Sequence, residues 1–266
     1  MGEAIVVTSG KGGVGKTTTT ANIGTALAQL GKKVCMVDTD IGLRNLDLVM
    51  GLENRIIFDL VDVIEGTCKI HQALLKDKRF EDLLYLLPAA QTKDKSCIEP
   101  RQMKELINEL KNEFDIILID CPAGIEHGFR NAIAGADKAI VVTTPDISSI
   151  RDADRVIGLL EQEKMFETYL VVNRIRPNLV KNGEMLDVDD VVTMLSVDPI
   201  GYVPDDEEVI KHLHLKEPVA MNHEAKAGIA YRNIARRMLG DSVPFMNLYE
   251  TNDGFMKKMK KMFGIH

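Results

Sequence analysis

The chain has 266 residues and a mass of 29.6 kDa, which is enough for one large domain or two small ones with a sizeable core. Hydrophobic residues make up 45% and charged residues 27% of the chain, a composition that excludes disorder and favours a soluble globular protein. The 40 acidic side chains outnumber the 33 lysines and arginines, giving a net charge of −7, so the protein as a whole has no positive field to attract nucleic acid.

The cysteines and the N-terminal residues indicate the cellular compartment of the protein. The four cysteines are scattered and form no C-x-x-C pair, which favours reduced, intracellular thiols over a disulfide framework or a cysteine-bound metal. No lysine or arginine precedes Lys11, and Glu3 is acidic, so the basic region of a signal peptide is absent. Because no uncharged apolar run approaches the roughly 20 residues of a spanning helix, we expect a cytoplasmic protein.

Short β-branched runs alternate with helix-like stretches along the chain. Strands are predicted over residues 4–8, 33–38, 83–87, 115–120, 138–144, 170–173 and 200–203, and helices over 16–30, 100–112, 148–163 and 187–195. This alternation predicts an α/β fold, with a doubly wound, mostly parallel sheet and helices on both faces. Since no boundary interrupts the pattern, we expect one domain over 1–240, a linker over 241–253 and a separate C-terminal helix over 254–266.

A glycine-rich motif separates the first predicted strand from the first predicted helix. It fits the pattern G-x-x-x-x-G-K-[ST] with Gly10, Lys11, Gly12, Gly13, Val14, Gly15, Lys16 and Thr17. In such a loop, backbone N–H groups and the start of the helix point at the phosphates. The lysine after the last glycine, Lys16, adds positive charge, and the hydroxyl of Thr17 binds magnesium. The sequence therefore predicts a site for nucleotide phosphates and Mg²⁺.

Lys11 is an unusual cation within this loop. Its position beside the phosphates allows it to act as a second positive charge, in its own or in a neighbouring subunit, as an arginine finger does. The simpler alternative is a solvated loop lysine.

Carboxylates follow two predicted strands at the edge where open α/β sheets bind ligands. Asp120 ends the strand 115–120 and suits magnesium binding, either directly or through water, as the Walker B residue. Asp38 and Asp40 end the second strand. We favour Asp40 as the group that orients the attacking water, with helix capping or a place in the magnesium shell as the alternatives.

The residues that end or follow the later strands include a candidate for binding the base. Asn173 ends the strand 170–173, and its amide both donates and accepts hydrogen bonds, which suits adenine. Pro204 and Asp205 follow the last strand. The acids at 206–208 are better explained by the start of a helix, whose N-terminus favours negative charge.

The C-terminal residues form a basic amphipathic pattern. On a helical wheel, Phe255, Met256, Met259, Met262 and Phe263 share one side, and Lys257, Lys258, Lys260 and Lys261 lie opposite. The last 12 residues hold these four lysines and no acid, so the rest of the chain carries a net charge of −11. The pattern predicts a helix that lies on an anionic membrane surface, with docking on another protein as the alternative.

These motifs together resemble those of the MinD/ParA family of deviant Walker A P-loop ATPases. The resemblance includes the loop from Lys11 to Thr18, the stretches 37–47 and 120–126, and the tail, and so covers essentially the whole chain. It implies that Lys11 is the signature lysine, that Thr18 belongs to the ATP-binding loop, that Asp40 is the catalytic aspartate of the first switch, and that Asn173, with the loop holding Pro204 and Asp205, contacts the base.

The same resemblance implies a function. It indicates an ATPase that dimerises face to face around two ATP molecules and binds the inner face of the cell membrane when dimeric. Its implied partners are a MinC-like division inhibitor and a topological factor, either MinE-like or a polar landmark. A ParA-type DNA-partitioning ATPase is the main alternative, but it would need a basic face on the folded domain, and neither the body charge nor the apolar tail favours it. A nucleotide-dependent scaffold and a small-molecule kinase are further alternatives.

Overall fold

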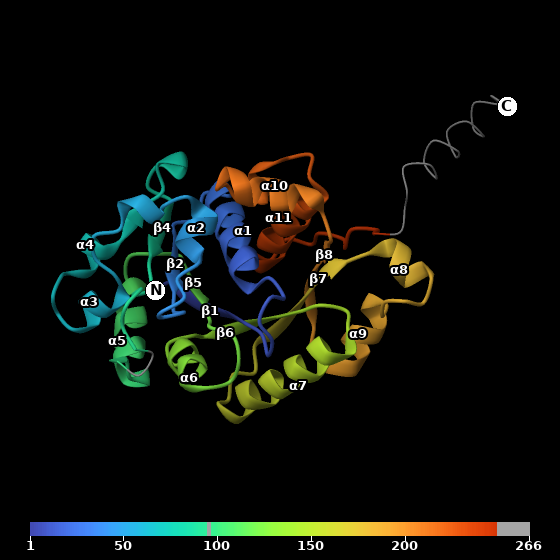
Figure 1. The fold of residues 1–266 in the computed structure, drawn as a ribbon, viewed down its shortest axis with the longest axis horizontal. Coiled ribbons are helices and arrows are strands. Elements are labelled where there is room, and N and C mark those ends of the chain that lie inside the picture. The colour runs from blue at the N-terminus through green and yellow to red at the C-terminus, as the bar shows by residue number, and fades with distance from the viewer. Residues whose placement is uncertain (95–96, 249–266) are drawn as a thin grey trace.

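The computed structural model describes residues 1–94 and 97–248. Within these residues the chain forms one eight-stranded sheet (Figure 1), in the order β3-β4-β2-β5-β1-β6-β7-β8, with only the short β3 antiparallel. The strands are β1 Glu3–Thr8, β2 Val34–Asp38, β3 Leu75–Lys76, β4 Leu84–Leu87, β5 Ile116–Asp120, β6 Lys138–Thr143, β7 Thr168–Ile175 and β8 Pro199–Pro204. The predicted doubly wound sheet is therefore confirmed.

Helices connect the strands and cover both faces of the sheet (Figure 1). The α-helices are α1 Lys16–Gln29, α2 Leu46–Met50, α3 Leu60–Ile64, α4 Ile70–Ala73, α5 Pro100–Leu110, α6 His127–Ile133, α7 Ile147–Gln162, α8 Pro177–Lys181, α9 Val188–Leu195, α10 Glu207–Leu215 and α11 Lys226–Met238. Short 3₁₀ helices span Glu53–Arg55, Lys78–Phe80 and Val219–Met221.

The core has two halves, one on each face of the sheet. Successive side chains of a strand point to opposite faces, so Ala4 and Val6 of β1 join the half that includes α5, α6, α7 and α9, whereas Ile5 and Val7 join the half under α1, α2 and α11. This two-sided burial explains why the central strands are apolar along almost their whole length. It makes the sheet a rigid support for the loops at its ends.

The order of the central strands brings distant parts of the chain together. β5 pairs with both β1 and β2 in parallel, so the carboxyl ends of all three strands lie at one edge. The P-loop follows β1 there, and Asp38 of β2 lies directly opposite Asp120 of β5. The candidate residues of three separated segments thus meet at the edge where open α/β sheets bind their ligands.

The main differences from the predicted elements concern short or small-residue helices and one longer strand. The sequence analysis did not single out α2, α3, α4, α6, α8 or α11, and β7 continues beyond the predicted end at Asn173 to Ile175. Its pairing with β8 is irregular between Val172 and Ile175, and Arg174 has a left-handed φ of 56°. Among the described residues, no helix has the combination of length and apolarity that crossing a membrane requires.

The predicted linker is described only in its first part. Residues 241–248 pack beside β8, where Phe245 stacks on Tyr202 with ring centroids 4.6 Å apart. The predicted amphipathic helix at 254–266 lies outside the described residues. The division into domain, linker and tail stays a prediction.

Candidate nucleotide-binding site

The P-loop connects β1 to α1 through a backbone that only glycine adopts easily. Gly13 and Gly15 have φ values of 81° and 99°, in the left-handed region that disfavours residues with a Cβ. Gly10 is required for a different reason, because a Cβ there would lie 2.1 Å from the carbonyl oxygen of Asp152 in α7. Gly15 precedes α1 without a side-chain cap in the described structure, which leaves N–H groups of the first turn to meet an anion.

The magnesium candidates converge beneath this loop. Asp120 is 2% exposed, and Thr20 Oγ1 lies 3.1 Å from its Oδ1. Burial, followed by repulsion from Asp38, raises the pKa of Asp120, while a hydrogen bond from Thr17 and the charge of Lys16 oppose the rise. A buried carboxylate beside a threonine hydroxyl is a hard oxygen donor set that suits Mg²⁺, and a cation there would favour the ionised form of Asp120. The predicted pair Thr17 and Asp120 therefore fits the metal.

Asp38 has a structural role that the sequence did not reveal. Its Oδ1 accepts a hydrogen bond of 2.9 Å from the N–H of Asp40, and its Oδ2 accepts bonds of 3.2 Å from the N–H groups of Asn45 and Leu46. Burial raises its pKa, although these three bonds oppose the rise. The carboxylate of Asp38 thus holds the backbone of the loop after β2. Asp40 is a half-buried residue of that loop.

Lys11 lies at the rim of the site on the start of α7. Its Nζ donates a hydrogen bond of 2.7 Å to Ser148 Oγ and lies 3.9 Å from Asp146 Oδ1. Asp146 is the N-cap of α7 and accepts a bond from the N–H of Ser149. Burial acts to raise the pKa of Asp146. Hydrogen bonds from Thr144, Ser149 and Ser148 outweigh burial and hold that pKa well below its usual range. Lys11 is therefore ordered by a charged partner at an exposed position.

Asn173 connects β7 to the P-loop. Its Nδ2 donates a hydrogen bond of 2.8 Å to the carbonyl oxygen of Val14, and its Oδ1 accepts one of 2.9 Å from the N–H of Arg174. Gly15 is closely packed on the same side chain, since a Cβ at this glycine would lie 2.4 Å from Asn173 Nδ2. The amide retains one N–H and one lone pair beyond these two bonds, which leaves it able to contact a base.

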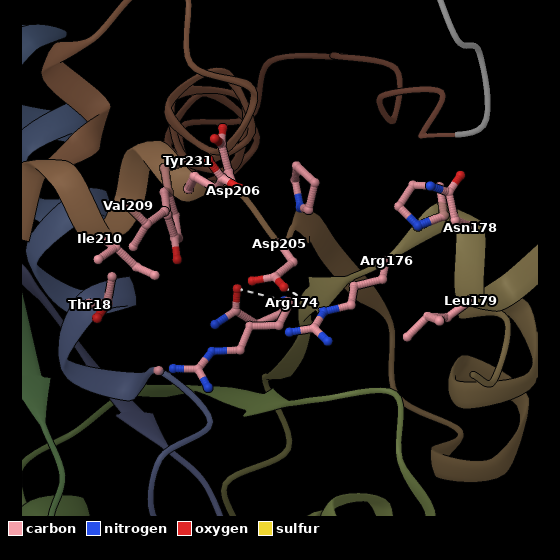
Figure 2. A pocket seen from close by; sticks show the side chains of 15 residues that line it. Thr18, Arg174, Arg176, Asn178, Leu179, Asp205, Asp206, Val209, Ile210 and Tyr231 are labelled. Atoms are coloured by element: carbon pink, nitrogen blue, oxygen red, sulfur yellow. Dashed lines mark hydrogen bonds and ion pairs between the residues drawn. The ribbon is translucent and has the colours of Figure 1, made fainter. Parts of the chain in front are cut away.

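A cavity of about 760 Å³ opens beside the P-loop (Figure 2). It brings together five of the predicted ATP-binding residues, namely Gly15, Thr18, Asn173, Pro204 and Asp205. Arg176 and Asp205 point toward each other on one side of the cavity and form an ion pair of 2.5 Å. The remaining lining includes apolar side chains such as Val209 and Ile210 of α10. The shape and lining suit a base and ribose attached to phosphates at the P-loop.

Several residues of the site were not singled out from sequence. Arg174, Arg176 and Tyr231 line the cavity, and Thr39 Oγ1 donates a bond of 2.7 Å to the carbonyl oxygen of Asp120. The one signal for the two arginines in the sequence is the polar stretch 173–178, which covers the end of β7 and the residues after it. The predicted helix start at 206–208 is confirmed, because Asp206 Oδ1 accepts a hydrogen bond of 3.0 Å from the N–H of Glu208 as the N-cap of α10.

Comparisons with known proteins identify relatives over the whole chain. A family model described as an AAA domain matches residues 2–165. The septum site-determining protein MinD of Bacillus subtilis is 67% identical over 266 residues, covering 100% of this chain and 99% of that protein. A chain of the MinC:MinD cell division protein complex of Aquifex aeolicus is 48% identical with a TM-score of 0.86, covering 92% of this chain and 99% of that one.

A second solved structure bears on the nucleotide. The septum site-determining protein MinD of Pyrococcus horikoshii, complexed with Mg-ADP, is 30% identical with a TM-score of 0.81, covering 91% of this chain and 100% of that one. These similarities confirm the predicted P-loop NTPase fold and the predicted ATPase activity, which ATP and Mg²⁺ fit. The roles of single residues stay predictions. The chain belongs to the MinD family of septum site-determining ATPases.

Proposed function

We propose that the protein couples ATP binding to dimerisation and to membrane attachment, and so recruits a division inhibitor to select the division site. In the ATP-bound state two copies associate through their nucleotide faces. The paired tails, residues 254–266, then hold the dimer on the inner face of the cell membrane. Hydrolysis separates the copies and returns them to the cytoplasm, so that the nucleotide controls the time spent on the membrane.

The observation that carries this proposal is the apolar rim of the nucleotide site. Leu43, Ile125 and Ile147 are 63%, 44% and 50% exposed, and they lie in the loops that follow β2 and β5 and at the start of α7. Lys11 contacts Ser148 beside Ile147. Exposed apolar side chains around a functional site mark an interaction surface, and a second copy in the face-to-face arrangement of this family would cover them.

The geometry of the site supports a role for each of its candidate residues. Lys16 and the N–H groups of the P-loop would bind the phosphates, while Thr17 and Asp120 would hold Mg²⁺, which would supply positive charge to the phosphates. Asp40, placed by the carboxylate of Asp38, orients the attacking water. Lys11 supplies a further positive charge at the dimer interface.

The tail provides a weak anchor that pairing strengthens. Its Phe and Met side chains would lie between the lipid headgroups and acyl chains, and each of its four lysines near an anionic surface contributes about 1 kcal/mol. One such helix binds reversibly, but two on one dimer act together and raise the affinity by orders of magnitude. This makes ATP-dependent dimerisation the control on membrane binding.

A division inhibitor is the proposed partner. The MinC:MinD complex of Aquifex aeolicus, whose chain is 48% identical to this one, supports a MinC-like protein in this role. A topological factor, MinE-like or a polar landmark, would then determine where the protein is released or retained. Binding of either partner does not require this protein to have a basic surface of the kind that binds DNA.

The test is cosedimentation with liposomes that contain anionic lipid. Full-length protein and a version that ends before Phe255 are each incubated with ATP or ADP, and Lys11→Ala is included as a dimer-defective variant. We expect ATP to move the full-length protein onto the lipid, and both changes to abolish that increase. Light scattering of lipid-free samples measures the mass of each variant with each nucleotide.

The outcomes separate the parts of the proposal. Equal binding in ATP and ADP would show that the nucleotide does not control attachment. Unimpaired binding of the truncated chain would exclude the tail as the anchor. If the protein instead shifted the mobility of nonspecific DNA in ATP, the ParA-type alternative would replace this proposal.

A further inference from the structure

Residues 241–248, called the strap below, are held tightly against the edge strand β8 (Figure 1). Arg237, near the end of α11, donates hydrogen bonds of 2.9 Å from Nε to the carbonyl oxygen of Val243 and of 2.8 Å from Nη2 to that of Pro244. Its Nη1 donates a third, of 2.9 Å, to the carbonyl oxygen of Ile200 in β8. One guanidinium group therefore joins α11, the sheet edge and the strap.

Aromatic and apolar contacts reinforce these bonds. The guanidinium carbon of Arg237 lies 4.3 Å from the centroid of the Phe245 ring, which stacks on Tyr202 of β8. Met246 packs against the core half under α1 and α11, and Leu248 packs against the half on the opposite face. The strap therefore crosses the open edge of the sheet from one face to the other.

This anchoring shortens the connection to the tail. With the strap in place, only residues 249–253 separate the last described residue from the predicted helix, and five residues span at most about 18 Å. If the strap came away from β8, residues 241–253 would all act as tether, and thirteen residues span up to about 45 Å. The effective concentration of a second binding group falls roughly as the −3/2 power of the tether length.

We infer that Arg237 is a positioning residue that sets the length of the tether between the ATPase domain and the membrane-binding tail. This inference rests on the proposed function. The longer tether would lower the effective concentration of the second tail about fourfold. The strap thereby contributes to ATP-dependent membrane binding without touching either the nucleotide or the lipid.

The experiment uses full-length protein and liposomes containing anionic lipid, with the apparent affinity measured in ATP. Arg237→Ala releases the strap, and Phe245→Ala is a milder change that leaves the hydrogen bonds of Arg237 to β8 in place. A third variant carries eight inserted Gly and Ser residues after Leu248, which lengthens the tether while the strap stays bound. Arg155→Ala, at an exposed position of α7, is the matched surface control.

The expected result is an about fourfold loss of apparent affinity for Arg237→Ala and for the insertion, a smaller loss for Phe245→Ala, and no change for Arg155→Ala. ATPase activity without lipid should be unchanged throughout. Chymotrypsin cleavage after Phe245 should be faster in Arg237→Ala and unchanged in the insertion variant, since only the former frees the strap.

Two results would overturn the inference while leaving the proposed function intact. One is wild-type affinity in the insertion variant, because tether length would then be irrelevant. The other is cleavage after Phe245 at the wild-type rate together with full affinity in Arg237→Ala, because the strap would then be held by other contacts. If wild-type protein itself shows no tail-dependent binding in ATP, the proposed function fails and this inference fails with it.

Discussion

The side-chain amide of Asn173 donates a hydrogen bond of 2.8 Å to the carbonyl oxygen of Val14, across 159 positions of the chain. Both residues are buried. The bond makes the end of β7 a support for the P-loop, so the residue expected to contact the base also helps to shape the phosphate site. The two halves of the nucleotide site are thereby linked.

Asn173→Ala should weaken both stability and nucleotide binding. Removing the donor leaves a buried carbonyl unsatisfied, which costs about 1–3 kcal/mol of unfolding free energy, and loosens the loop that binds the phosphates. Urea unfolding and nucleotide titration by calorimetry would measure the two effects. Asn178→Ala, an exposed position lining the same cavity, is the control and should change neither by much; equal behaviour of the two variants would contradict the linkage.

Asp38 and Asp40 should behave differently when mutated. Asp38→Asn removes acceptor capacity from a carboxylate that holds three backbone N–H groups, and should cost about 1–3 kcal/mol of stability. Asp40→Asn should leave stability within about 0.5 kcal/mol and retain ATP binding, yet reduce kcat about 100-fold or more if Asp40 orients the water. Single-turnover ATP hydrolysis and urea unfolding distinguish the two, and an unchanged kcat in Asp40→Asn would exclude the catalytic assignment.

The stability of the nucleotide-free and metal-free protein should fall as the pH rises. Burial and the charge of Asp38 raise the pKa of Asp120 from 3.8 to about 8. A carboxyl group with a raised pKa retains its proton in the folded state, so its contribution is complete below the unfolded pKa and is lost as the pH rises through the folded one. Each retained proton makes the free energy of unfolding fall by about 1.4 kcal/mol per pH unit.

Urea unfolding between pH 5 and 8 tests this pH dependence. Asp120→Asn should flatten the slope relative to the wild type, because the titrating group is gone. Addition of Mg²⁺ and ATP should stabilise the wild type more at pH 8 than at pH 5, since the ionised form of Asp120 binds the cation. Parallel slopes in the two proteins would show that Asp120 does not retain a proton.

Gly10→Ala should disrupt the P-loop by overlap with α7. The added Cβ would lie 2.1 Å from the carbonyl oxygen and 2.6 Å from the Cβ of Asp152, so the loop must move. We expect this movement to lower the free energy of unfolding by about 1–3 kcal/mol and the ATP affinity by at least about tenfold. Gly158→Ala in α7 is the matched control, since no atom lies within 4 Å of the added Cβ. Thermal unfolding and ATP titration compare them; normal ATP affinity in Gly10→Ala would rule out this packing constraint.

The sequence by itself determined the elements whose signal is local. The pattern from Gly10 to Thr17 marks the P-loop because the phosphate site is built from consecutive backbone groups. The apolar runs of the central strands mark a sheet covered on both faces, and a carboxylate at the end of such a run, as with Asp120, must lie at the ligand-binding edge. These features need no knowledge of how distant segments meet.

Only the tertiary structure decided how the polar groups are shared between segments. Asp38 holds the loop after β2, Asn173 supports Val14, Lys11 contacts Ser148, and Arg237 binds the strap. Each side chain has several hydrogen-bonding groups that could serve a ligand, the backbone or another side chain, and the choice depends on which atoms the fold brings within about 3 Å. Residue type and spacing therefore indicate the chemistry, but the packing of distant segments against one another assigns the partners.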